Sequence, residues 1–145
     1  VFREYRIVPK IDTPNELTVV LNDNFKITYF HFPYPRLYPV VTHNRLQICS
    51  IFDIASNKVH TIGRRGEWKD YVDIYFLINR SGVNLEKIIS DAKKRFEGEF
   101  NEKLFLEQLV YWGDLRDFII DYIGRPTSRA KIQTFFKDMV KKKVS

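Results

Sequence analysis

The 145-residue sequence contains one cysteine, one methionine and no long apolar run. A disulfide within the chain is excluded because Cys49 has no second cysteine to pair with, and this cysteine use is typical of a reducing compartment. We therefore expect a cytoplasmic protein. No stretch approaches the roughly 18 apolar residues of a membrane-spanning helix, so we expect no membrane partner. The first methionine is Met139, and we expect the natural polypeptide to begin before Val1.

Acidic residues are outnumbered by basic ones. The 24 Lys and Arg residues against 18 Asp and Glu give a net charge of +6, which suits anionic partners such as nucleotides or RNA. Apolar residues make up 44% of the sequence and can form a core, since a chain of this length buries roughly two-thirds of its unfolded surface. His31, His43 and His60 lack the spacing of zinc ligands, so we assign no metal ligand from the sequence.

The first third of the chain reads as strands. β-branched and aromatic residues alternate with polar ones around the turn at Asn22-Asp23-Asn24, which predicts a hairpin. Pro33 and Pro35 then end the last long strand, because proline cannot donate to a sheet ladder. The expected strands cover residues 2–8, 17–21, 25–32 and 45–49.

The stretch from residue 51 to 78 combines helical periodicity with a dense set of charges. Ser50 has the spacing of an N-cap, and Asp53, three residues on, completes a capping box. Gly63 ends this helix, and a second helix follows Gly66. The charges therefore gather at a helix-turn-helix corner, where we expect Lys58 and Asp73 to point into one cleft.

The rest of the chain reads as helical. Asn84 caps one helix, another follows Asn101, and glycine or proline separates those that come later. Strands followed by five or six helices predict an α+β fold, with strands in 1–49 and a helical domain in 50–145, forming one compact unit. The expected later helices are 85–97, the residues after Asn101 as far as Gly113, 114–123, and a last one beginning at Thr127 or Ser128.

The charges at this corner also have simpler explanations. Lys69 and Asp73, four residues apart, could form a surface ion pair worth about 0.3–0.5 kcal/mol. Lys58 could be a solvated helix lysine, and Arg64-Arg65 could stabilise a helix C-terminus. These readings stay open on the residues alone.

Three stretches resemble AbiEii-type nucleotidyltransferases, the toxins of abortive-infection and toxin–antitoxin pairs. They are FHFPYP at 30–35, DIASNKVHTIGRRGEWKDYVDIYFLI at 53–78 and LEQLVYWGDLRD at 106–117. The middle one is the most specific, because it combines the lysine, the basic turn, the Lys-Asp-x-x-Asp spacing and the Tyr-Phe-Leu that follows. The resemblance covers about residues 15–120.

The resemblance implies strands from a nucleotidyltransferase-like sheet, followed by a helical bundle. Such proteins transfer a nucleotidyl group from a nucleoside triphosphate to RNA or another acceptor, with Mg²⁺ held by carboxylates. It also implies a nucleoside triphosphate, RNA and a cognate antitoxin as partners. By this resemblance Lys58 contacts the triphosphate, Asp73 is the catalytic aspartate, and the residues that bind substrate are Lys58, Arg64, Arg65, Lys69 and Asp70.

The sequence departs from the family at the metal site. The family's N-terminal Gly-Ser and Asp-x-Asp are both missing from this sequence, and Thr28 stands where some relatives carry an acidic residue. We therefore expect an N-terminal catalytic portion to lie outside this chain. We expect no nucleotidyl transfer by the chain itself, although its basic groups should still bind a triphosphate weakly.

Two alternatives remain. The chain could be a degenerate, non-catalytic module that binds nucleotide, RNA or an antitoxin. It could also be an unrelated basic RNA-binding domain. The second alternative is the weaker, because Phe30, Phe32 and Tyr34 are interrupted by prolines and suit a core better than a base-stacking surface.

Overall fold

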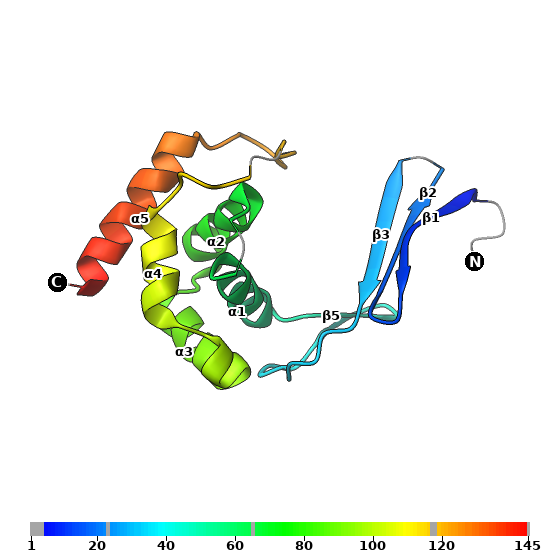
Figure 1. The fold of residues 1–145 in the computed structure, drawn as a ribbon, viewed down its shortest axis with the longest axis horizontal. Helices are drawn as coiled ribbons and strands as arrows, with labels where there is room; N and C mark the ends of the chain where they lie inside the picture. Colours follow the sequence, from blue (N-terminus) through cyan, green and yellow to red (C-terminus); the bar gives the residue numbers. More distant parts are fainter. Residues whose placement is uncertain (1–4, 23, 65, 117–118, 145) are drawn as a thin grey trace. The chain divides into compact units, whose positions relative to one another are not determined.

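A computed structural model describes residues 5–22, 24–64, 66–116 and 119–144. It has an α+β fold, with an N-terminal antiparallel sheet followed by helices (Figure 1). The chain forms two units, Val1–Tyr34 and Pro35–Ser145, and each is described by itself. This division places residues 35–49 with the helices, whereas the sequence-based division fell after residue 49. The single compact unit stays a prediction.

The first unit is a three-stranded sheet in the order β1-β2-β3. Its strands are β1 (Ile7–Thr13), β2 (Glu16–Leu21) and β3 (Phe25–Phe30), each antiparallel to the next. Of the strand expected at 2–8, residues 2–4 lie outside the described residues, and residues 7 and 8 belong to β1, which continues to Thr13 and contains Pro9. Proline is tolerated there because β1 is an edge strand, and the register shifts between Pro9 and Ile11.

The two faces of this sheet differ in polarity. Residues that pair across antiparallel strands point to the same face, so the register defines both faces. On one face the hydroxyls of Thr18 and Thr28 lie 2.9 Å apart. The other face is mostly apolar, and Phe25 on it is 71% exposed. Apart from Asp12, which pairs with Leu17, this apolar face carries Ile7, Pro9, Leu17, Val19, Leu21, Phe25, Ile27 and Tyr29.

The second unit opens with a short hairpin and continues as helices. In the described part of the chain these are five α-helices and one 3-10 helix, and none is long and apolar enough to cross a membrane. The elements are β4 (Val41–His43), β5 (Leu46–Ile48), α1 (Ile51–Ile62), α2 (Trp68–Ser81), α3 (Leu85–Phe96), η1 (Glu97–Glu99), α4 (Glu102–Val110) and α5 (Arg129–Val144).

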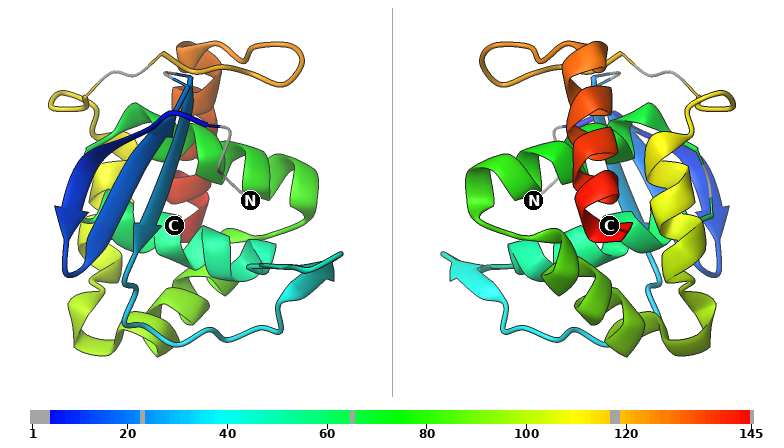
Figure 2. Two further views of the ribbon diagram at one scale, coloured as in Figure 1. Left: turned by 90° about the vertical axis from the view of Figure 1, so that its right-hand side faces the viewer. Right: turned by 90° about the vertical axis from the view of Figure 1, so that its left-hand side faces the viewer.

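The core of the second unit lies between these helices. α1 packs against α2 and α3, and α5 packs against α4 and α2 (Figure 2). Each helix turns one stripe inward, as its apolar periodicity predicts. The buried side chains include Ala55, Val59, Ile62, Tyr71, Ile74, Ile88, Ala92, Phe96, Phe105, Leu109, Ile132 and Phe136.

The helix caps predicted at Ser50 and Asn84 are confirmed, and the structure adds a third cap at Asn101. The amide oxygen of Asn84 accepts from the Lys87 N–H at 2.8 Å, and that of Asn101 accepts from the Leu104 N–H at 3.0 Å. The Ser50 hydroxyl caps α1 in the same way. Each cap satisfies one of the N–H groups that a helix start leaves without an intrahelical partner.

The capping box predicted at Asp53 is wrong. The fully buried carboxylate of Asp53 does not return to Ser50, but accepts from the backbone N–H groups of Leu37 and Tyr38 at 3.0 and 3.2 Å. The Arg95 guanidinium lies 3.5 Å from the same carboxylate and donates to the Asp53 carbonyl. The carboxylate therefore fastens the segment before α1 to the helices.

The helix predicted for 114–123 is also wrong in the parts that the structure describes, 114–116 and 119–123. Arg116 instead pairs with Glu67 in a parallel bridge. The Arg116 N–H donates to the Gly66 carbonyl at 2.9 Å, and the Trp68 N–H donates to the Arg116 carbonyl at 3.1 Å. This long-range backbone pairing overrides the local helical pattern. A Cβ on Gly66 would lie 2.8 Å from the Leu115 side chain, so the close approach favours glycine.

Candidate functional site

Lys58 lies on α1, on the side that meets α2, the helix that follows the turn at Gly63. Its ammonium is 2.9 Å from a carboxylate oxygen of Asp70 and 2.5 Å from one of Asp73. The two aspartates share a face of α2 because they are three residues apart. We call these three residues the Lys58 corner. The side chains of Lys58 and Asp73 meet, as predicted, whereas a cleft shared by both stays a prediction.

The two aspartates differ in their access to solvent. The Asp70 side chain is 1% exposed, whereas the Asp73 side chain is 47% exposed. Lys58 lies between them at 27%. One carboxylate is thus held in the protein interior, while the other can turn toward solvent or a ligand.

Lys58 stays charged at neutral pH. Burial works to lower its pKa, but the hydrogen bonds to Asp73 and then Asp70 oppose burial and raise the pKa of Lys58 above the ordinary 10.5. With both aspartates ionised, the Lys58 corner carries two negative charges and one positive. Two carboxylates occupy two of the three N–H donors of the ammonium, so an anionic ligand can reach it through the third donor or by displacing a carboxylate.

The other predicted cations that the structure describes, Arg64 and Lys69, each have a carboxylate partner. Arg64 pairs with Glu99 of η1, and both side chains are about half exposed. The Lys69 ammonium lies 3.0 Å from the carboxylate of Glu67. Arg65 lies outside the described residues. The structure thus joins Lys58 to Asp70 and Asp73, and shows Arg64 and Lys69 in ion pairs with residues outside the Lys58 corner.

A cleft beside Asp73 was not predicted from the sequence. It has a volume of about 270 Å³ and lies between α2 and residues 120–123. We call it the Phe76 cleft. Its α2 wall carries Asp73, Phe76 and Arg80, spaced three and then four residues apart, which is the spacing of one helix face. That spacing was visible in the sequence, but residues 120–123, which form the facing wall of the cleft, were expected to be part of a helix.

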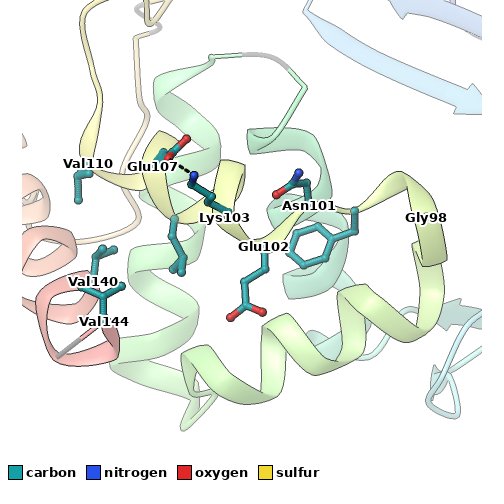
Figure 3. A pocket seen from close by; sticks show the side chains of 10 residues that line it. Gly98, Asn101, Glu102, Lys103, Glu107, Val110, Val140 and Val144 are labelled. Atoms are coloured by element: carbon teal, nitrogen blue, oxygen red, sulfur yellow. Dashed lines mark ion pairs between the residues drawn. The ribbon is translucent and has the colours of Figure 1, made fainter.

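A larger hollow lies elsewhere in the second unit. Figure 3 shows it between η1, α4 and α5, with a volume of about 750 Å³. Val110, Val140 and Val144 line it, and Lys103 and Glu107 form an ion pair of 3.9 Å at its margin. No residue of the Lys58 corner lines this hollow. Its size alone therefore does not make it the site.

Comparison with known proteins finds a relative whose sequence matches most of this chain. An uncharacterized protein of Aquifex aeolicus (strain VF5) is 30% identical over 125 residues, which are 85% of this chain and 59% of that protein. No family model and no solved structure matches the chain. The name of the relative states no activity. The resemblance to nucleotidyltransferases therefore rests on the three sequence stretches quoted above.

Proposed function

We propose that the chain is the part of a nucleotidyltransferase-like protein that contacts a nucleoside triphosphate. The observation that carries the proposal is the Lys58 ammonium, shared between one buried and one half-exposed aspartate. Lys58 contacts the triphosphate, and Asp73 is the catalytic carboxylate of the complete protein. The acceptor of the transferred group is RNA or another molecule.

Asp70 and Asp73 have different roles in this proposal. Asp70 positions Lys58, because its buried carboxylate has little freedom to leave the ammonium. Asp73 is the exchangeable partner, and a phosphate oxygen can replace it in a charge-assisted hydrogen bond with Lys58. The unequal exposure of the two carboxylates is what allows this exchange without loss of the position of Lys58.

Mg²⁺ is the metal that the resemblance implies. Asp73 offers a half-exposed carboxylate oxygen, a ligand type that Mg²⁺ accepts. Among the described residues, no three His, Cys, Asp or Glu side chains are grouped so that they could hold a metal ion. These residues do not fit a magnesium site by themselves. The proposal for this chain is therefore confined to contact with the triphosphate.

Binding should be weak and sensitive to salt. Arg64 and Lys69 lie near the turn between α1 and α2, but each is partly exposed and already paired with a carboxylate. Attraction between exposed charges is screened over roughly 10 Å at 0.1 M salt. Raising the salt concentration should therefore weaken triphosphate binding.

The test is a titration with inorganic tripolyphosphate and with a nucleoside triphosphate at low salt, followed by backbone amide shifts. Residues 58–73 should respond selectively. Lys58→Ala should abolish the response, whereas Asp73→Asn should strengthen it, because the competing negative charge is gone. Lys87→Ala is the matched control, since Lys87 also pairs with a buried aspartate, Asp91, at 2.7 Å.

Three results would contradict the proposal. The first is the absence of a selective response at the amides of residues 58–73, and the second is a response that Lys58→Ala leaves intact. Equal losses in Lys58→Ala and Lys87→Ala would indicate non-specific attraction to a basic protein. In each case the Lys58 corner is a structural ion-pair cluster. Such a result would favour the alternative of a non-catalytic module that binds RNA or an antitoxin.

A further inference from the structure

The Phe76 cleft brings several flat groups together. The rings of Phe76 and Tyr122 meet edge to face, with centroids 6.0 Å apart and planes at 66°. The Arg80 guanidinium lies over the Phe76 ring, 4.6 Å from its centroid. All three residues line the cleft, and both rings are partly exposed.

Flat groups of this kind recognise flat ligands. Aromatic rings and arginine guanidinium planes are the surfaces on which proteins stack nucleobases that are not paired in a duplex. The cation over the ring adds electrostatic attraction to stacking. Asp73 and Asp121, also in the lining, can accept hydrogen bonds from amino groups or hydroxyls.

Asp73 belongs to both the Phe76 cleft and the Lys58 corner. Its carboxylate lies 2.5 Å from the Lys58 ammonium and also lines the cleft. A ligand with an anionic end at Lys58 and a planar ring in the cleft would therefore pass beside Asp73. A single nucleotide has both parts, joined by a sugar.

We infer that the Phe76 cleft binds the nucleobase of the nucleotide whose triphosphate contacts Lys58. This inference rests on the proposed function and adds the part that distinguishes a nucleotide from free polyphosphate. The volume of about 270 Å³ is slightly below the roughly 300–1,000 Å³ of pockets for whole small molecules. It suits a ligand that is only partly enclosed, with its phosphates outside the cleft.

The experiment compares three probes on the full chain by amide shifts: a nucleoside triphosphate, inorganic tripolyphosphate and a free nucleoside. The nucleoside triphosphate should bind more tightly than tripolyphosphate, and the nucleoside alone should shift residues 72–80 and 120–123. Phe76→Leu should weaken binding of the nucleoside triphosphate by roughly 5-fold or more, the scale of one stacked base. It should leave tripolyphosphate binding unchanged.

Two further variants guard against a general loss of structure. Arg80→Gln removes an exposed cation from the cleft and should also weaken binding of the nucleoside triphosphate more than binding of tripolyphosphate. Phe52→Leu is the matched control, because Phe52 is a partly buried ring on α1 that packs against the Tyr38 ring and lies outside the cleft. It should change neither affinity.

The outcomes separate the two proposals. If nucleoside triphosphate and tripolyphosphate bind equally and the nucleoside shifts no cleft residue, the base site is refuted while the triphosphate site stands. If the nucleoside shifts the cleft residues but tripolyphosphate leaves Lys58 unaffected, the triphosphate contact is refuted and the base site stands. If no probe perturbs either region, both are refuted.

Discussion

The sheet of the first unit and the second unit, Pro35–Ser145, which we call the helical unit, bury their apolar side chains to very different extents. In residues 5–22 and 24–34, the buried side chains are those of Thr18 and Leu21. The helices, by contrast, fully bury large residues such as Tyr71, Phe105 and Phe136. Both regions have the periodicity of a half-buried element, yet in the helical unit each apolar stripe meets another one.

The difference shows which region carries its own stability. A helix pair covers its stripes mutually, whereas a three-stranded sheet has no second layer of its own for its apolar face. We therefore expect the helical unit to supply most of the free energy of unfolding. Trp68 and Trp112 both lie in the helical unit, so tryptophan fluorescence follows its unfolding selectively.

The largest expected effect comes from the core of the helical unit. Phe105→Ala should lower the free energy of unfolding by about 3–5 kcal/mol, because the fully buried ring leaves a cavity. Phe25→Ala on the sheet should change it by no more than about 0.5 kcal/mol, since that ring is exposed. Urea unfolding followed by tryptophan fluorescence measures Phe105→Ala, and circular dichroism, which also reports strands, measures Phe25→Ala. Similar losses in the two variants would mean that the apolar face of the sheet is covered in solution.

The second effect concerns the buried ion pair. Arg95→Met should cost about 3 kcal/mol, because it leaves the Asp53 carboxylate buried without its cation. The control Lys103→Met removes an exposed lysine whose pair with Glu107 spans 3.9 Å, and should have little effect. Urea titrations of both variants are the measurement. A loss in Arg95→Met as small as in the control would show that Asp53 is satisfied by backbone N–H groups alone.

A smaller effect is expected at the start of α3. Asn84→Ala should cost about 1 kcal/mol, because the Lys87 N–H loses its acceptor. Asn84→Ser should restore most of that loss, since serine is also a favoured N-cap. Thermal unfolding by circular dichroism compares the three chains. Equal stability of the alanine and asparagine forms would show that the cap contributes nothing measurable.

The smallest effect is a pH dependence from His60, which stacks on Phe96 with ring centroids 4.0 Å apart. Burial, and then the charge of Arg64, lower the pKa of His60 below the ordinary 6.5. Between that lowered pKa and 6.5 the unfolded chain binds a proton that the folded chain does not, so stability falls as the pH falls through this range. His60→Phe should remove this contribution in urea titrations at pH 5 and pH 8. An unchanged difference between the two pH values would assign the dependence to other groups.

Local patterns predicted the local features of this structure. The caps at Ser50 and Asn84 and the meeting of Lys58 with Asp73 depend on residues close in sequence or on two successive helices. The predictions for Asp53 and for residues 114–116 were wrong because the partners of these residues are distant in sequence. A capping pattern cannot reveal that the Leu37 and Tyr38 amides take the Asp53 carboxylate, and a helical period cannot reveal a bridge to Glu67.

The bridge between Glu67 and Arg116 bears on the order in which the Lys58 corner and the Phe76 cleft form. Lys58 and Asp70 are separated by 12 residues, so α1 and α2 can bring them together early. Closing the bridge forms a loop of roughly 50 residues, whose entropy cost is about 1 kcal/mol larger than that of the shorter loop between Lys58 and Asp70. We therefore expect the Lys58 corner to form before the wall of the Phe76 cleft that follows Arg116 in the chain. In pulsed hydrogen exchange during refolding, the Arg116 amide should gain protection after those of α1.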